Sequence, residues 1–369
     1  MSGEPPQRPA STRREFLSGR AAQRAVERAG EALADRLTEG SAGTQAGATV
    51  RLETRAMGCP WNVILNPGPP RQVMQASDAL DVVHQVERRL TVYRDDSDVA
   101  RLNATAAEGP QAADRELFEF LVWTRELCER ADGAFDSAAG ALVALWRRAR
   151  QELTVPTQGQ IAAALDVCGV RRIGFDAAAG TISFPAPGFA FDLGAVGKGY
   201  GVDRAAEALA ASGLEDFVLH GGYSSIAARG DHLGQGGWPV ALTNPLFLDE
   251  PYVTLLLRDE ALGTSGSNVQ FYRHEGRRYG HVLDPRTGWP AEGLLSVSVV
   301  ARSAAEADAF STALYVMGLE KATAWCQDHL EIGAILVPPA DAAGNLHPVI
   351  CNLPEERLFF ADARSDGAD

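Results

Sequence analysis

The sequence predicts an α+β fold that combines strand-rich and helix-rich regions. Segments with strand and helix character come in runs and do not alternate strictly, as a doubly wound sheet would require. Strand and turn signals dominate residues 216–301, whereas helical periodicity dominates residues 73–167. No internal repeat is visible, and 369 residues are enough for an ample hydrophobic core.

The first part of the body is predicted as two strands followed by helices. Alternating apolar residues indicate strands around Val50–Leu52 and Val63–Leu65, and Pro67-Gly68-Pro69-Pro70 forces a turn after them. Apolar residues at helical spacing predict a helix over 73–90. Three more helices are expected over 114–131, 137–151 and 158–167.

The second part of the body mixes strands with two helices. We expect short strands around 172–175 and 181–184, and then a helix from Gly199 to Ala211. After the strand-rich region, Ser303–Met317 is predicted as a helix with Gly318 at its end, and Gly333–Val337 as the final strand.

Residues 49–361 are expected to form one folded domain between two extensions. Residues 1–48 are predicted as a charged helix over 14–38 with a linker, and 362–369 as a polar tail. Arg13-Arg14 resembles a twin-arginine export signal, but charged residues follow where an apolar segment is needed. We therefore expect a cytoplasmic protein without a membrane span, and the paired arginines leave export open.

The composition argues against several classes of protein. With 34 basic and 48 acidic residues the net charge is −14, which is unfavourable for a nucleic-acid binder. Five scattered cysteines without CxxC spacing argue against a disulfide framework and a zinc site, and favour reduced, partly buried thiols. Only two of the basic residues are lysines, so their positions are informative.

One lysine, Lys198, lies in the glycine-rich stretch from Asp192 to Gly201, just before a predicted helix. Backbone amides at a helix start, together with an ammonium group, suit a phosphate. The stretch lacks the spacing of a P-loop and of a dinucleotide-binding fingerprint. The alternative is a tight turn that carries a solvated lysine.

A second candidate site lies on the helix that Ser303 and Glu306 begin as a capping box. Asp308, Ser311 and Thr312 share one face of that helix, and their hard oxygen atoms suit Mg²⁺. An ordinary solvated helix face is the alternative.

Two further stretches carry candidate residues. A predicted strand leads His281 into the turn Asp284-Pro285, and histidine is suited to acid–base work near neutral pH. A hydrogen-bonded turn histidine without function is the alternative. In Ala131–Asp136 a helix ends before Phe135 and Asp136, for which a plain helix end with a buried phenylalanine is the alternative.

Taken together, these stretches resemble the ApbE family, the FAD:protein FMN transferases, over roughly residues 50–361. Seven motifs occur in the family's order. They are Arg55-Ala-Met57-Gly58, Tyr93–Asn103, Asp132–Asp136, Asp192–Asp203, Thr264-Ser265-Gly266, His281–Gly288 and Ala307–Leu314.

The resemblance implies a T-fold-like α+β fold of mixed, largely antiparallel sheets with flanking helices and a cleft for FAD. It implies FAD contacts near Met57, Tyr93, Ala134, Phe135, Asp136, Asp192, Lys198 and His281. It also implies Mg²⁺ held by the carbonyl of Ala195, by Asp308 and Thr312, and by Ser311. A Thr or Ser hydroxyl of a target protein, expected to be a redox protein, would take FMN and release AMP. His281 is the candidate proton-handling residue.

The sequence departs from the family in three places, so it resembles a divergent member. His220-Gly221-Gly222-Tyr223 replaces the family's N-x-G-G-D/N region, Ser267-Asn268 replaces an aromatic residue and an arginine, and Cys59 replaces a threonine. FAD hydrolysis to FMN and AMP, and flavin binding without turnover, are therefore alternatives to transfer.

Overall fold

The computed structural model describes residues 49–247, 250–266 and 270–360. The predicted helix 14–38, the linker, the tail 362–369 and the Ser267-Asn268 departure lie outside the described residues.

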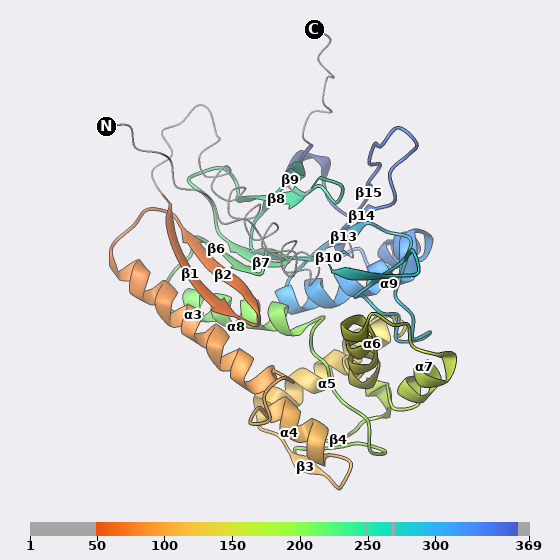
Figure 1. Cartoon of the computed structure of the whole chain (residues 1–369). Helices are drawn as coiled ribbons and strands as arrows, with labels where there is room; N and C mark the ends of the chain where they lie inside the picture. Colours follow the sequence, from red (N-terminus) through yellow and green to blue (C-terminus); the bar gives the residue numbers. More distant parts are fainter. Residues whose placement is uncertain (1–48, 248–249, 267–269, 361–369) are drawn as a thin grey trace, which may run out of the picture.

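An eight-stranded antiparallel sheet forms the centre of the molecule (Figure 1). Its strand order is β1-β2-β6-β7-β10-β13-β14-β15, and every neighbouring pair runs antiparallel. The strands are β1 (Val50–Ala56), β2 (Cys59–Leu65), β6 (Phe217–Gly221), β7 (Ser225–Arg229), β10 (Glu260–Gly266), β13 (Ser296–Ala301), β14 (Gly333–Val337) and β15 (Val349–Cys351).

Three helices cover one face of this sheet: α3 (Arg71–Leu90), α8 (Gly197–Ala211) and α9 (Ala304–Asp328). Alanine, valine and leucine side chains of α3 and α8 pack on Trp61 and Phe217 of the sheet. Small residues at the crossings let the helices approach closely, and burial of the apolar faces drives this packing.

The other face of the sheet packs against a three-stranded sheet of order β16-β9-β8. It comprises β8 (Trp238–Thr243), β9 (Pro251–Leu257) and β16 (Leu358–Phe360). Alternate residues of β8 and β9 enter the shared core, as the two-residue period of a strand requires.

The remaining elements form a second, mainly helical part below the sheet (Figure 1). Its helices are α4 (Asp98–Thr105), α5 (Arg115–Arg130), α6 (Gly140–Glu152) and α7 (Gln158–Leu165). A small sheet joins β3 (Gln111–Ala112), β5 (Thr181–Ser183) and β4 (Gly174–Asp176), and a separate hairpin pairs β11 (Phe271–His274) with β12 (Arg277–Gly280).

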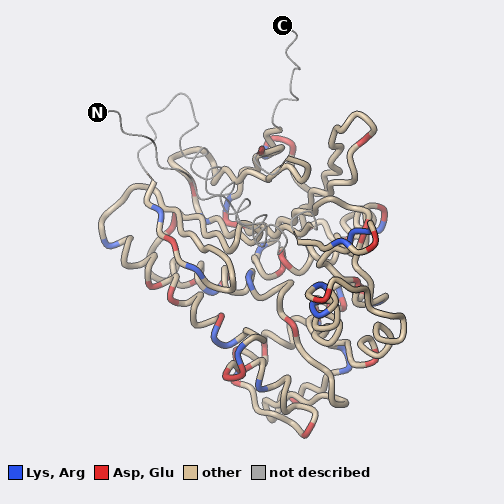
Figure 2. Tube along the Cα trace, in the orientation of Figure 1, with Lys and Arg blue, Asp and Glu red and all other residues tan. Residues whose placement is uncertain are grey.

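Acidic and basic positions are interspersed along the described trace (Figure 2). Among the described helices, none combines the length and apolar character that crossing a lipid bilayer requires.

The predicted fold class is confirmed, and two details of the prediction need correction. β14 is not the final strand, because β15 and β16 follow it. The predicted helix end at Gly318 is confirmed: the backbone leaves helical geometry there, with φ 76°, and a second helical stretch, joined to the first across a kink within α9, runs on to Asp328. Short α4, which Ser97 caps, was not predicted because eight residues give little periodic signal.

Helices α8 and α9 cross so closely that Gly199 lies against the backbone of Ala304 and Ala305. A methyl group on Gly199 would overlap the carbonyl group of Ala304. Glycine is therefore required here for backbone contact and not for a special φ.

Replacing Gly199 with alanine is expected to lower the free energy of unfolding by about 2–3 kcal/mol, because the helices must separate. Urea titration followed by circular dichroism measures it. Gly159→Ala on α7 is the control, since a Cβ there meets no atom within 4 Å, and the helix propensity of alanine predicts no loss. Equal stability of the two variants would contradict the close approach.

A second prediction concerns His220 on β6, which lies on the same sheet face as Val218, turned away from α8. Burial, together with the positive charge of Arg51, lowers the pKa of His220 to about 4. The unfolded chain therefore binds more protons than the folded chain below pH 6.5, and stability is lost as pH falls through that window.

Relative to His220→Gln, the wild-type chain should lose up to about 2 kcal/mol of stability between pH 7 and pH 5. Urea titrations of both proteins at the two pH values measure this difference, and all other titrating groups cancel in the comparison. If the difference in stability between the two proteins did not change with pH, the pKa of His220 in the folded protein would be that of an ordinary histidine.

Candidate functional site

Asp308 is the buried centre of the predicted metal site. Ser303 caps α9, and Asp308 follows in the second turn with 5% of its surface exposed. Its carboxylate accepts hydrogen bonds at 2.7 Å from the hydroxyl of Ser225 and at 2.8 Å from the backbone N–H of Gly199. Burial raises the pKa of Asp308, against the opposing effects of Lys198 and these donors.

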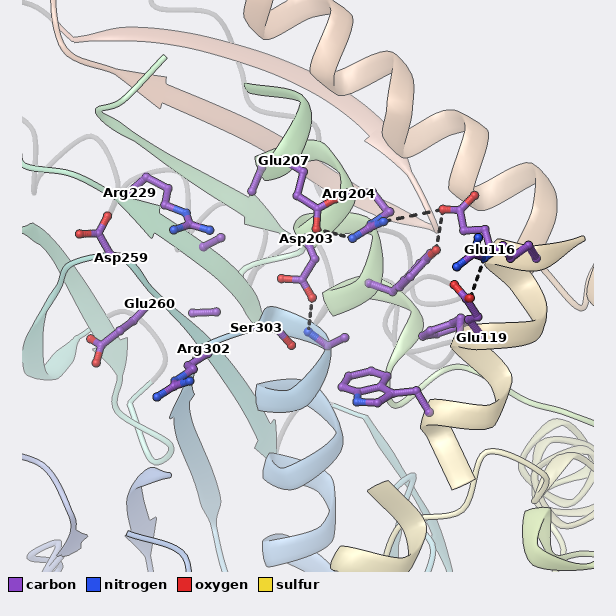
Figure 3. A pocket seen from close by; sticks show the side chains of 18 residues that line it. Glu116, Glu119, Asp203, Arg204, Glu207, Arg229, Asp259, Glu260, Arg302 and Ser303 are labelled. Atoms are coloured by element: carbon purple, nitrogen blue, oxygen red, sulfur yellow. Dashed lines mark hydrogen bonds and ion pairs between the residues drawn. The ribbon is translucent and has the colours of Figure 1, made fainter. Parts of the chain in front are cut away.

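Asp203 forms the reciprocal contact from α8 to α9. Its carboxylate accepts hydrogen bonds from the backbone N–H groups of Ala304 (2.7 Å) and Ala305 (2.9 Å), and Figure 3 shows it pointing toward the start of α9. Burial raises the pKa of Asp203 to about 6, although both N–H groups oppose this. Each helix thus supplies a carboxylate that caps the other.

Lys198 lies in the first turn of α8, beside the turn between β6 and β7. Its ammonium donates a hydrogen bond to the hydroxyl of Ser224 at 2.7 Å. Gly222 in that turn has φ 62°, and a Cβ there would lie 2.8 Å from the sulfur of Cys59. Two of the regions in which the sequence departs from the family motifs, around Gly222 and at Cys59, therefore meet next to the predicted phosphate-binding lysine.

Hydroxyl groups lie beside Asp308, as the shared helix face predicts. Ser265 of β10 lies 2.9 Å from the hydroxyl oxygen of Ser311 and 3.1 Å from that of Thr312. Ser311 also donates to the carbonyl oxygen of Asp308 at 2.9 Å. Ala195 is half-buried in the turn that precedes α8. The solvated-face alternative is wrong for Asp308 and Ser311, which are 5% and 1% exposed.

Arg147 of α6 connects two of the predicted FAD contacts. It donates to the hydroxyl of Tyr93 at 2.9 Å, and its guanidinium carbon lies 4.8 Å from the centre of that ring. The same nitrogen lies 3.4 Å from Asp192. Tyr93 is 72% exposed, so its ring is open to a ligand.

Met57 lies in the β1–β2 turn, at φ 50°. Its backbone N–H donates to Glu87 at 2.6 Å. The end of its side chain lies beside Gly201 of α8, so this turn is held against the helix that carries Lys198.

The Ala134–Asp136 segment is largely internal. Ala134 and Phe135 are 0% and 2% exposed and belong to the main core. Asp136 accepts hydrogen bonds from the backbone N–H groups of Ala138 (2.8 Å) and Val170 (3.0 Å), and burial raises its pKa. These contacts match the buried-phenylalanine alternative, and flavin contact by this segment stays a prediction.

His281 directly follows β12, and its Nδ1 lies 3.2 Å from the carbonyl oxygen of Gln270. A carbonyl can only accept, so Nδ1 carries the proton and Nε2 keeps its lone pair. The residue reaches solvent, but protein atoms crowd the ring. This desolvation lowers the pKa of His281 to about 4, with Arg150 and Lys198 adding to the effect.

A separate pocket of about 520 Å³ opens between α5, α8 and the end of the sheet at which β7 ends and β10 begins (Figure 3). Aromatic side chains of Phe120, Trp123 and Tyr200 share its wall with charged residues of both signs. None of the residues predicted to bind FAD or metal lines it.

Some residues of the site were missed by the sequence reasoning. Ser224 and Ser225 directly follow the region at Gly222-Tyr223 that departs from the family, and they were not singled out, yet they bond to Lys198 and Asp308 respectively. Arg147 carried no signal, because it is one of 32 arginines and its partners lie far away in the sequence.

Comparison with known proteins identifies the family. The model of the ApbE family matches residues 57–336. A relative from Treponema pallidum, named FAD:protein FMN transferase, is 32% identical over 277 residues, which are 71% of this chain and 76% of that protein. A Klebsiella pneumoniae protein of the same name is 29% identical over 264 residues, covering 71% of this chain and 81% of the relative.

Solved structures agree with this match. The ApbE protein of Thermotoga maritima superposes with a TM-score of 0.73 at 26% identity, over 81% of this chain and 96% of that one. The apo flavinyl transferase ApbE of Pseudomonas stutzeri gives 0.71 at 27% identity, over 82% and 95%. The chain therefore belongs to the ApbE family and is an enzyme of the transferase class.

Proposed function

We propose that this protein is a Mg²⁺-dependent FAD:protein FMN transferase that moves FMN from FAD to a Thr or Ser hydroxyl of a target protein. The relatives' names support the overall reaction. The observation that carries it for this chain is the cluster in which a buried carboxylate, a lysine ammonium and several hydroxyls lie around the meeting point of α8 and α9.

The donor set fits Mg²⁺ bound together with a pyrophosphate. Asp308, Thr312, Ser311 and the carbonyl of Ala195 would supply hard oxygen atoms. Among the described residues, no group of three or more His, Cys, Asp or Glu side chains could hold a metal. A magnesium ion here would therefore rely on one carboxylate, completed by hydroxyl and carbonyl oxygen atoms, water and substrate phosphates. When bound, Mg²⁺ would neutralise charge on the pyrophosphate during phosphoryl transfer.

The chain's own residues would bind FAD and handle the proton. Lys198 would place a positive charge on the phosphates, and Ser224 holds its ammonium in position. Met57, Tyr93, Asp192 and the Ala134–Asp136 segment would contact the rest of FAD. The acceptor hydroxyl oxygen would bond to the FMN-side phosphorus as the bond to AMP breaks, and Nε2 of His281 would accept the hydroxyl proton.

We further propose that residues 49–361 form the transferase unit and that the protein acts in the cytoplasm on a flavin-carrying redox protein. The family match over 57–336 supports the first part. The charged sequence after Arg13-Arg14, where an export signal needs an apolar segment, supports the cytoplasmic location.

Transfer predicts AMP release from FAD and Mg²⁺ only when an acceptor is present. The experiment incubates the protein with FAD and Mg²⁺, with and without a Thr-containing acceptor peptide, and measures AMP and flavin-labelled peptide. Asp308→Asn is the control variant and should release no AMP, because it removes the buried charge. AMP release without acceptor would indicate a hydrolase, and no AMP in either case would indicate a flavin-binding protein without turnover.

Replacing His281 with alanine should slow FMN transfer about 100-fold or more, because the proton acceptor is lost. The measurement is the initial rate of peptide flavinylation at saturating FAD and Mg²⁺. His274→Ala is the matched control, since His274 lies on the same hairpin and bonds to the carbonyl oxygen of Leu153. Unchanged turnover in His281→Ala would refute the assignment.

A further inference from the structure

Cys326 and Cys351 meet where the end of α9 lies against the edge strand β15. Cys326 belongs to the last turn of α9, and Cys351 is the last residue of β15. The side-chain amide of Asn352 donates to the carbonyl oxygen of Cys326 at 2.8 Å and to that of Ile332 at 2.9 Å. Bonds that do not involve the thiols therefore hold the two segments together.

The two thiols lie in the same buried apolar cluster and each shifts the pKa of the other, so they are close neighbours. Cys326 and Cys351 are 1% and 9% exposed. The neighbouring thiol of Cys326 lowers the pKa of Cys351. Cys351 is thus both the more nucleophilic and the more exposed thiol of the pair.

The other three cysteines have different surroundings. The thiols of Cys59 and Cys168 donate to backbone carbonyl oxygens, and that of Cys128 lies 3.8 Å from a carboxylate oxygen of Asp136. All five cysteines are unlinked in the structure.

We propose that Cys326 and Cys351 are an oxidation site that closes to an internal disulfide with hydrogen peroxide as the oxidant. The Cys351 sulfur attacks one peroxide oxygen and becomes a sulfenic acid, and one water leaves. The Cys326 sulfur then attacks the Cys351 sulfur and displaces its oxygen as a second water. Peroxide gains two electrons, and the two thiols lose two electrons and their two protons.

The disulfide would act on stability and not on the catalytic site. It would close a loop of about 25 residues that contains β14, and so restrict the unfolded chain. Gly318, where α9 leaves helical geometry, separates Cys326 from the half of the helix that carries Asp308 and Thr312. Oxidation should therefore raise the melting temperature and leave the catalytic side chains in place.

The test treats the folded wild-type protein with hydrogen peroxide, blocks remaining thiols after denaturation, and maps the disulfide by mass spectrometry. Trypsin leaves both cysteines in the peptide 322–357, which contains no internal Lys or Arg, so a second protease that cleaves after Glu331 is needed to separate them. We expect a Cys326–Cys351 link and a melting temperature about 5 °C above that of the reduced protein. The rate of FAD-dependent AMP release should stay within twofold of the rate of the reduced protein.

The variants separate this pair from general oxidation. Cys351→Ser should form no link and show no rise in melting temperature after peroxide treatment, whereas Cys168→Ala should behave as wild type. The proposal is overturned if peroxide produces no Cys326–Cys351 link in the wild-type protein, if it links other cysteines equally, or if the linked protein melts no higher than the reduced one.

Discussion

The reciprocal capping of α8 and α9 is the contact on which the candidate site depends. Asp203 of α8 accepts two N–H groups at the start of α9, and Asp308 of α9 accepts one at the start of α8. Since Gly199 allows backbone contact, the two carboxylates can reach across. This geometry fixes Lys198, Asp308 and Thr312 relative to each other before any ligand arrives, so little binding energy would be needed to organise them.

The arrangement has an electrostatic cost that the surroundings offset. Both carboxylates are buried, which raises their pKa, and the charge of Asp308 raises that of Asp203 further. Lys198, the hydroxyl of Ser225 and the backbone N–H groups oppose this effect. A buried carboxylate held in this way gains from a nearby cation, which is why a metal is an apt partner for Asp308.

The long elements and the order of motifs were predictable from the sequence, because helical periodicity and strand alternation are local signals. α3 and the part of α9 before Gly318, which carries Asp308, illustrate this. The shared helix face also placed Asp308 and Ser311 together correctly. Contacts between distant segments were not predictable: Ser225 lies 83 residues from Asp308, and Asn352 lies 26 residues from Cys326. The break at Gly318 was predicted correctly, because glycine commonly terminates helices, but nothing local showed that a second helical stretch follows it within α9.

The departures from the family motifs do not all lie at the site. His220 faces away from α8, whereas Gly222 and Cys59 lie against Lys198.

The contact of Asp203 with the start of α9 affects where a phosphate could bind. A helix start attracts anions, but the start of α9 already has a carboxylate of the protein as its anion. α8 has no side-chain cap at Val196. The start of α8 has the carboxylate of Asp308 on a single N–H group, that of Gly199, so it is the less occupied of the two neighbouring helix ends, and it is the end that carries Lys198.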